Sequence, residues 1–330
     1  MGVVMPATTV QTEVIKNAVQ LACHAPSLHN SQPWAWEYHS GRLDLFLDPS
    51  RVMGSDRSGR EALISCGAVL DHLRVAIAAA GWQANVNRFP DPDNPNHLAS
   101  IDFTATDQVT DAQRRRAEAI LVRRTDRLPF MAPTDWESFE PALQNAVDGS
   151  GVRLEVMSRD ARPQLVEASQ LADSLRLYDS SYHAELAWWT APFEVSEGIP
   201  HGSLLSAAES DRVDVARLFP VARHGERRAG VPEDHAKVLV LSTDGDDRAD
   251  ALASGEALSI VLLECTMAGL VSCPVTHITE VRASRDVIRA LLDQDAMPQV
   301  LVRVGVAPAM EEPPPATPRR PLDDVLRVRD

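Results

Sequence analysis

A loop rich in hydroxyl and amide side chains is the first segment whose residues could do chemistry. Its sequence is HAPSLHNSQPW (residues 24–34), with Ser27, Asn30 and Gln32 following a turn at Pro26. Hydroxyl and amide groups supply both hydrogen-bond donors and acceptors, so they can bind the edge of a planar heteroaromatic ligand. A loop in which Ser27 and Asn30 bond only their own backbone is the structural alternative. These residues alone leave both interpretations open.

A basic cluster near the end of a predicted helix is the second such segment. RRTDRLPF (residues 123–130) contains Arg123, Arg124, Thr125 and Arg127. The guanidinium group is planar and matches two phosphate oxygens at once, so arginine is suited to phosphate recognition. On its own, a basic helix end is better explained by solvated charges that complement the helix dipole.

A third segment and a C-terminal arginine pair complete the set. The segment GLVSCPVTHI covers residues 269–278, and the tail PRRPL (residues 318–322) contributes Arg319 and Arg320. A second arginine pair in an acidic protein is compatible with an anion site. Taken alone, the tail is typical of an exposed extension.

Hydrophobic spacing predicts the elements that must position these segments. We expect helices over residues 12–25, 61–81, 111–123, 161–177 and 248–269. We expect strands at WAWEY, LDLFLD, HLASIDFTA, VRLEVMS, HAKVLVLST and PQVLVRVGVA. Residues 87–97 are rich in Asn, Asp and Pro and indicate a loop.

Two of the predicted helices, 61–81 and 248–269, contain a repeated pattern. In each matched pair the second residue lies 188 positions after the first: Gly67 and Gly255, Leu70 and Leu258, Gly81 and Gly269. Alanine-rich helices often resemble one another by composition alone. The matched glycines and the similar neighbouring strands nevertheless favour an internal duplication.

Length, charge and cysteine usage narrow the class of protein. The chain has 330 residues, of which 44% are hydrophobic, enough for about two domain-sized units. Its net charge of -15 repels nucleic acid and anionic lipid, so we expect neither a nucleic-acid partner nor a membrane partner. The four cysteines form no C-x-x-C pair, so we expect no metal site. A reducing cytoplasm fits this composition.

The segments resemble those of the nitroreductase superfamily, and most closely its Acg-type branch. APSLHNSQPW resembles the flavin-binding loop, RRTDRLPF the R-x-S-x-R-x-F phosphate segment, and GLVSCPVTHI the GLGSCPI-type segment. The Arg-Arg-Pro tail resembles the C-terminal phosphate contact. The resemblance covers roughly residues 10–105 and 112–325. It implies an α+β, nitroreductase-like fold with a central mixed sheet flanked by helices, and flavin mononucleotide (FMN) as cofactor.

Carried over position by position, the resemblance implies a set of cofactor-binding residues. The loop residues are Pro26, Ser27, Asn30 and Gln32, with Ser27 and Asn30 at the flavin ring or ribityl chain. The phosphate or ribityl contacts are Arg123, Arg124, Thr125, Arg319 and Arg320. Arg127 would place positive charge near N1 and O2 of the ring, and Pro274, Val275 and Thr276 would provide the backbone near N5. No residue is assigned a catalytic role.

The order of the segments departs from that of an ordinary nitroreductase, where the phosphate segment precedes the APS loop. Here TEVIKNA stands where the first half should carry its arginines, and the second half has no APS loop. The resemblance therefore implies a single-chain pseudo-dimer with halves at residues 10–110 and 111–325. It would hold one complete flavin site and would be a monomer.

A long irregular stretch, residues 178–236, is expected to form a lid-like insertion that is helical only over about 203–219. Two functions stay open. The first is an oxidoreductase in which NAD(P)H reduces the flavin, which then reduces a nitro compound (such as a nitroaromatic) or a quinone. The second is an FMN storage or sequestering protein whose covered flavin does not turn over with NAD(P)H. A flavin-free interaction protein would require the Arg123–Arg127 cluster to be coincidental.

Overall fold

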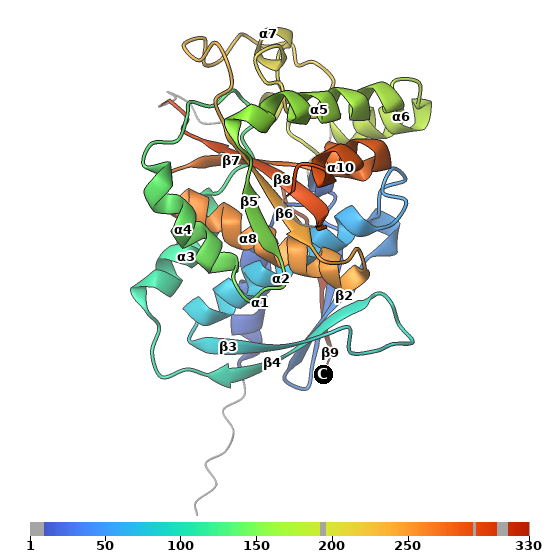
Figure 1. Ribbon diagram of the computed structural model, residues 1–330. Coiled ribbons are helices and arrows are strands. Elements are labelled where there is room, and N and C mark those ends of the chain that lie inside the picture. The colour runs from blue at the N-terminus through green and yellow to red at the C-terminus, as the bar shows by residue number, and fades with distance from the viewer. Residues whose placement is uncertain (1–9, 192–195, 293–294, 309–315, 330) are drawn as a thin grey trace, which may run out of the picture.

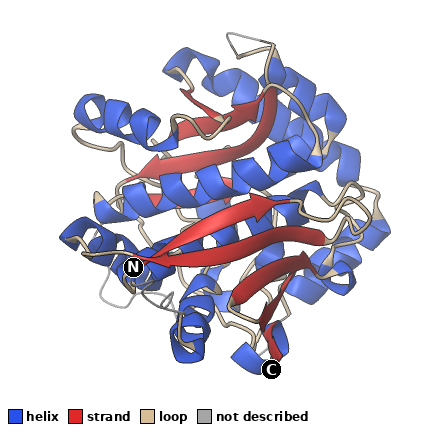
Figure 2. Ribbon diagram, turned by 90° about the horizontal axis from the view of Figure 1, so that it is seen from below, coloured by secondary structure: helices blue, strands red, loops and turns tan. Residues whose placement is uncertain are grey.

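Two sheets lie on opposite sides of a pair of long central helices in the computed structural model, which describes residues 10–191, 196–292, 295–308 and 316–329 (Figure 1). The same layering is visible from below (Figure 2). The predicted mixed α+β fold is confirmed, but the strands form two sheets in place of one central sheet. Because both central helices are apolar on nearly every side, each needs cover on more than one face.

The first sheet has the strand order β3-β4-β2-β1-β9, and the second has the order β5-β6-β8-β7. The strands of the first are β1 (Trp34–His39), β2 (Arg42–Leu47), β3 (Trp82–Arg88), β4 (His97–Ala105) and β9 (Leu326–Arg329). Those of the second are β5 (Arg153–Val156), β6 (Lys237–Thr243), β7 (Val271–Val275) and β8 (Met297–Gly305). Neighbouring strands are antiparallel, except that β9 runs parallel to β1.

Helices fill the centre, and further helices cover the outer face of the second sheet (Figure 1). In the first half they are α1 (Thr12–Ala22) and α2 (Arg60–Ala79). The α-helices described after them are α3 (Asp111–Val122), α4 (Trp136–Val147), α5 (Arg162–Arg176), α6 (Ser180–Trp189), α7 (Ala207–Ser210), α8 (Arg248–Met267), α9 (His277–Glu280), α10 (Arg282–Arg289) and α11 (Leu322–Val325). Short 3-10 turns cover Leu28–Asn30, Pro49–Arg51, Arg159–Ala161 and His201–Ser203.

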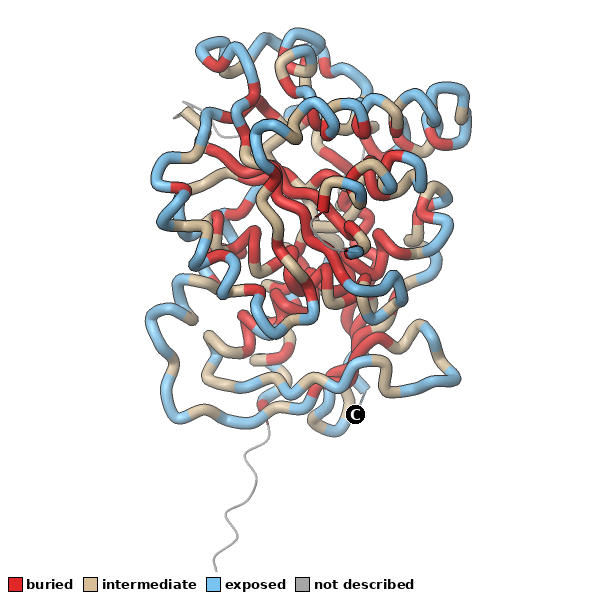
Figure 3. The backbone as a smooth tube through the Cα atoms, viewed as in Figure 1, coloured by how far each residue is buried: buried red, intermediate tan, exposed pale blue. Residues whose placement is uncertain are grey.

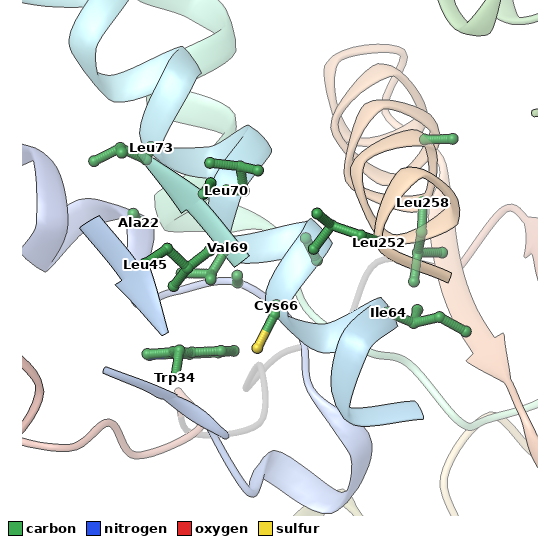
Figure 4. Close-up of a cluster of buried hydrophobic side chains, with 14 of the residues drawn as sticks. Ala22, Trp34, Leu45, Ile64, Cys66, Val69, Leu70, Leu73, Leu252 and Leu258 are labelled. Carbon is green, nitrogen blue, oxygen red and sulfur yellow. The ribbon is translucent and has the colours of Figure 1, made fainter. Parts of the chain in front are cut away.

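The two central helices, α2 and α8, touch at a pair of glycines. A Cβ atom on Gly67 would lie 2.0 Å from the carbonyl oxygen of Leu252, and one on Gly255 would lie 2.0 Å from that of Ile64. Only glycine permits this approach of two backbones. Apolar side chains such as Ile64, Leu252 and Leu258 pack around the crossing (Figure 4). By length and composition α2 could cross a membrane, but 83% of that stretch is buried inside the fold (Figure 3).

The two halves share one topology. In each, two strands precede a long central helix and two strands follow it, as β1-β2-α2-β3-β4 and β5-β6-α8-β7-β8. The sheet orders β3-β4-β2-β1 and β7-β8-β6-β5 match, and both sheets carry an irregularity at the equivalent strand pair. The C-terminal segment departs from this plan, because β9 joins the first sheet.

The helix predicted within the insertion was wrong. Residues 203–219 are not one helix: the α-helical part is only α7, and α6 is a helix that the sequence did not predict. The hydrophobic pattern failed because Arg212 donates to the Arg228 and Val231 carbonyls and so fixes an irregular path. Residues 192–195 of this insertion lie outside the described part of the chain.

Candidate functional site

A pocket between the two halves brings several of the predicted segments together. Its wall contains Pro26, Ser27, Leu28 and His29 of the loop, Glu61, Ile64 and Ser65 of α2, Thr125 and Arg127, and Leu258 of α8. It also contains Cys273, Pro274, Val275 and Thr276 around β7, Arg303 of β8, and Leu205, Ala216, Arg217 and Phe219 of the insertion. Its free volume is about 100 Å³. Seven predicted binding residues therefore line one pocket: Pro26, Ser27, Thr125, Arg127, Pro274, Val275 and Thr276.

The loop that begins at Pro26 is held in an unusual backbone path. His29, Asn30 and Gln32 all have positive φ angles of 50°, 62° and 50°. The Ser27 hydroxyl accepts from the Gln32 amide at 3.0 Å, and the Ser65 hydroxyl of α2 accepts from the Leu28 amide at 3.2 Å. These bonds stabilise the left-handed turns and hold the loop against α2.

Asn30 and Gln32 bind other parts of the protein. Asn30 Nδ2 donates to the carbonyls of Pro318 at 3.0 Å and Gly198 at 3.1 Å. Gln32 Oε1 accepts from the Arg320 amide at 2.9 Å, and its Nε2 donates to the Ser196 carbonyl at 3.0 Å. The two side chains thus tie the loop to both the C-terminal tail and the insertion, and neither is part of the pocket wall described above.

Arg123, which is buried, and Arg319, which is partly buried, form a pair of cations beside the loop. Both donate to the His24 carbonyl, at 3.3 Å and 2.9 Å. Nε and Nη1 of Arg123 and Nε of Arg319 are buried without an acceptor among the described residues. Burial, reinforced by nearby guanidinium groups, lowers the pKa of Arg123 to about 9 and that of Arg319 to about 10. Buried donors without acceptors destabilise the fold unless an anion binds them.

The other two predicted arginines lie differently. Arg124 is exposed, and its Nη1 donates to the carbonyls of Leu121 and Arg123 at 2.8 Å, close to the end of α3. Arg320 donates to the carbonyls of Gln32 at 3.2 Å and Trp34 at 3.3 Å, where β1 begins. The structure therefore places the buried unpaired donors on Arg123 and Arg319.

The insertion contributes an aromatic ring to the pocket wall. The guanidinium carbon of Arg127 lies 5.2 Å from the centre of the Phe219 ring. His29 meets the same ring edge-on at 5.6 Å. Burial lowers the pKa of Arg127. Arg127 is thus a buried cation that contacts an aromatic face.

Arg217 is the second side chain that the insertion places at the pocket. It donates to Thr276 Oγ1 at 3.0 Å and to the Tyr182 hydroxyl at 2.8 Å, and it forms a buried ion pair with Glu280. Burial opposes ionisation of Glu280, but Arg217 overcomes it and the pKa falls to about 2. This pair fixes the insertion to the turn that follows β7.

Further ion pairs hold the insertion in place. Asp234, which is buried, pairs with Arg303 of β8 at 2.7 Å and with Arg162 of α5 at 3.1 Å. Glu209, also buried, pairs with Arg227 at 2.9 Å within the insertion. Charged partners at both ends make the described part of the insertion a fixed component of the pocket.

Sequence reasoning missed Glu61, Arg217 and Phe219. Glu61 belongs to no recognised motif, although a carboxylate in the first turn of a long apolar helix is a signal worth testing. Arg217 and Phe219 come from the irregular insertion, and their positions depend on contacts with residues far away in the sequence. No local pattern could have placed them.

Comparison with known proteins gives the family. No family model matches the chain. A Mycobacterium tuberculosis protein, acg, named as a candidate NAD(P)H nitroreductase, is 62% identical over 326 residues, which is 98% of each chain. A second candidate NAD(P)H nitroreductase of that species, Rv3131, is 38% identical over 320 residues, covering 95% of this chain and 91% of its own.

Solved nitroreductases match less closely. The FMN-dependent nitroreductase NfnB of Mycobacterium smegmatis, in complex with NADPH, is 18% identical with a TM-score of 0.35, covering 60% of this chain and 89% of its own. A nitroreductase of Desulfitobacterium hafniense with bound FMN is 11% identical with a TM-score of 0.41, covering 66% and 98%. Because acg is 62% identical over nearly the whole of both chains, this chain belongs to the Acg-type branch of the nitroreductase family.

Proposed function

We propose that the chain binds one FMN in the pocket between its halves and retains it behind the insertion. The buried, unpaired donors of Arg123 and Arg319 carry this proposal, since they need an anion such as a phosphate. Arg123 lies two residues before Thr125 of the pocket wall, so a phosphate at the arginines and a ring in the pocket are compatible with one ligand. The Desulfitobacterium hafniense nitroreductase contains bound FMN, and NfnB of Mycobacterium smegmatis is FMN-dependent.

One FMN for each chain follows from the proposed origin of the halves. Residues 10–110 and 111–325 would be two fused copies of a nitroreductase subunit, which their common strand order supports. The loop of Ser27 belongs to the first copy and the segment of Arg127 to the second. One complete site would then form inside one chain, and the protein would be a monomer.

When bound, FMN supplies two-electron redox chemistry. The chain would hold it with hydroxyl groups of Ser27 and Thr125 and with the cations Arg123 and Arg319. Arg127 would stabilise negative charge on the reduced ring. The carboxylate of Glu280 would keep Arg217 in the wall and so keep water out of the pocket.

Two uses of such a flavin remain, and the geometry favours retention. The insertion that covers the pocket is held by buried ion pairs, which favours a flavin that stays enclosed. NAD(P)H-dependent reduction of nitro compounds or quinones is the second candidate. The names of the relatives support it, since two of them are candidate NAD(P)H nitroreductases.

An anaerobic titration separates the two. The purified chain is loaded with FMN, its flavin content is measured from the visible spectrum, and excess NADH or NADPH is added. Retention predicts that the flavin band persists and that only dithionite bleaches it. Bleaching within seconds by either nucleotide would establish the reductase instead. A chain that takes up no FMN would refute both.

A further inference from the structure

A large open cleft lies next to the flavin pocket. Its volume is about 900 Å³, and its walls come from the N-terminal ends of α2 and α8, from α9 and α10, and from the α5–α6 region. Glu61 borders both this cleft and the pocket. Glu280 borders the cleft, whereas its partners Arg217 and Thr276 border the pocket. Glu61 and Glu280 therefore stand in the wall that separates the pocket from the cleft.

Glu61 is a buried carboxyl group with a second carboxyl group beside it. Only 4% of Glu61 is exposed, and the side chain of Asp56 lies within hydrogen-bonding reach. Asp56 Oδ2 accepts from the Ala62 amide at 2.9 Å, and Oδ1 is buried with no other partner in the described part of the chain. A neighbouring carboxyl group makes ionisation of Glu61 less favourable, so Asp56 helps to raise the pKa of Glu61.

The groups around Glu61 favour its protonated form. Burial raises its pKa well above the ordinary value, Arg60 opposes this, and Asp56 and Glu280 raise it further. Arg60 forms an ion pair with Glu61, and it also donates to the carbonyls of Thr279 at 2.7 Å and Gln299 at 2.9 Å.

Glu280, the other carboxyl group in the wall between the pocket and the cleft, favours its ionised form. Arg217 outweighs burial and lowers the pKa of Glu280 to about 2, so Glu280 is a fixed negative charge. Two neighbouring carboxyl groups whose environments drive their pKa values apart are typical of a site where one group transfers protons and the other provides charge.

We propose that Glu61, partnered by Asp56, transfers protons between the open cleft and the flavin pocket when a bound flavin changes its redox state. This inference rests on the proposed binding of FMN. With a reductant that gives electrons and no hydride, such as dithionite, Glu61 would break its O–H bond and release one proton, which a bound flavin that has gained two electrons would take up. Glu61, which itself lines the cleft, would then regain a proton from water there. The insertion can stay closed throughout.

The test uses the FMN-loaded full chain in an infrared cell at a controlled electrode potential. In the reduced-minus-oxidised spectrum we expect a C=O band of a protonated carboxyl group to change. In Glu61→Gln that band should be absent, and reduction should slow at least about tenfold because the proton donor is lost. Asp56→Asn, which keeps the shape of the neighbour, should shift the band because it removes the carboxyl group beside Glu61.

The matched control is Glu256→Gln, since Glu256 is also a buried glutamate of a central helix paired with arginine, but it borders neither cavity. It should keep both the band and the rate. A Glu61→Gln protein that binds FMN and retains the wild-type band and rate would overturn the inference while leaving FMN binding intact. If Glu61→Gln does not bind FMN, the test depends on Asp56→Asn. An Asp56→Asn protein with the wild-type band and rate would then overturn the inference. Failure of the wild-type chain to bind FMN would instead refute the proposed function.

Discussion

The two sides of the central helix pair differ in what fills them. On one side, the strand after α8 leads into Cys273–Thr276 and borders the pocket. On the other side, the residues 188 positions earlier are 85–88. The last of them, Arg88, donates through its guanidinium to the carboxylate of Glu256 of α8 at 2.7 and 2.6 Å. Arg74 of α2 approaches the same carboxylate at 3.4 Å. The two sides share a topology but differ in their charges. Among the described residues, Arg123 and Arg319 on one side have no carboxylate partner, whereas Arg88 and Arg74 on the other side share the carboxylate of Glu256.

The contrast teaches that the fold alone does not define a binding site. Arg123 and Arg319 have buried donors without acceptors in the part of the chain that the structure describes, whereas Arg88 has two bonds to one carboxylate. The first arrangement costs stability until an anion arrives, and the second stabilises the chain by itself. The predictions below test this difference.

The largest effect is expected where the two sides meet. Gly67→Ala should lower the free energy of unfolding by about 3 kcal/mol, because the new Cβ would collide with the Leu252 backbone. Gly255→Ala should cost a similar amount. Gly225→Ala, in open space, is the control and should change little. Urea denaturation measures all three, and equal stability of Gly67→Ala and Gly225→Ala would contradict the close crossing.

Replacing one arginine on each side should have opposite consequences. Arg123→Met should weaken FMN binding by about 100-fold, since a charge-assisted contact of about 2–3 kcal/mol is lost. The same change should stabilise the flavin-free chain by about 1 kcal/mol, because it removes a buried unpaired charge.

Arg88→Met is the counterpart on the filled side. It should leave FMN affinity unchanged and lower stability by about 1 kcal/mol, discounted because Arg88 is partly exposed. Fluorescence titration and urea denaturation of both variants give the comparison. If Arg88→Met weakened FMN binding as much as Arg123→Met, the assignment of the two sides would be wrong.

Lowering the pH should reduce the stability of the fold partly through His277, which lies on the pocket side. Burial, with Arg217 nearby, lowers the pKa of His277 to about 3 from an ordinary 6.5. Below pH 6.5 the unfolded chain takes up a proton that the folded chain refuses, so stability is complete above pH 6.5 and declines towards pH 3. His277→Asn should flatten this decline in urea midpoints measured across that range. A decline equal to that of the wild type would show that His277 does not contribute.

The smallest effect is expected at Asn30, whose hydrogen bonds join the loop to the C-terminal tail and to the insertion. Asn30→Ala removes the bonds to the Pro318 and Gly198 carbonyls and puts alanine at a φ of 62°. We expect FMN to dissociate about fivefold faster, in keeping with about 1 kcal/mol for such a bond. Hydrogen exchange should rise at residues 196–198 and 316–320 and stay unchanged in β6. Uniform loosening would indicate a general loss of stability instead.

The sequence predicted most strands and the long helices, because their hydrophobic spacing is regular and their burial follows it. It also identified the segments that meet in the pocket, since Ser27, Thr125, Arg127 and Thr276 lie in recognisable motifs. It did not predict α4, β3, β7, β9 or the path of the insertion. Those depend on long-range contacts, such as the pair of Arg217 with Glu280, which no local pattern encodes.

The parallel pairing of β9 with β1 has a consequence for biosynthesis. Trp36 is in register with Leu326, so the first sheet gains its edge strand only from residues 290 positions later in the chain. Arg319, on the same segment, also reaches His24. Contacts this distant in sequence form slowly. A chain still emerging from the ribosome therefore lacks both the edge strand and one of the two cations beside the loop, and we expect the nascent protein to be unable to capture FMN until residue 329 is free to fold.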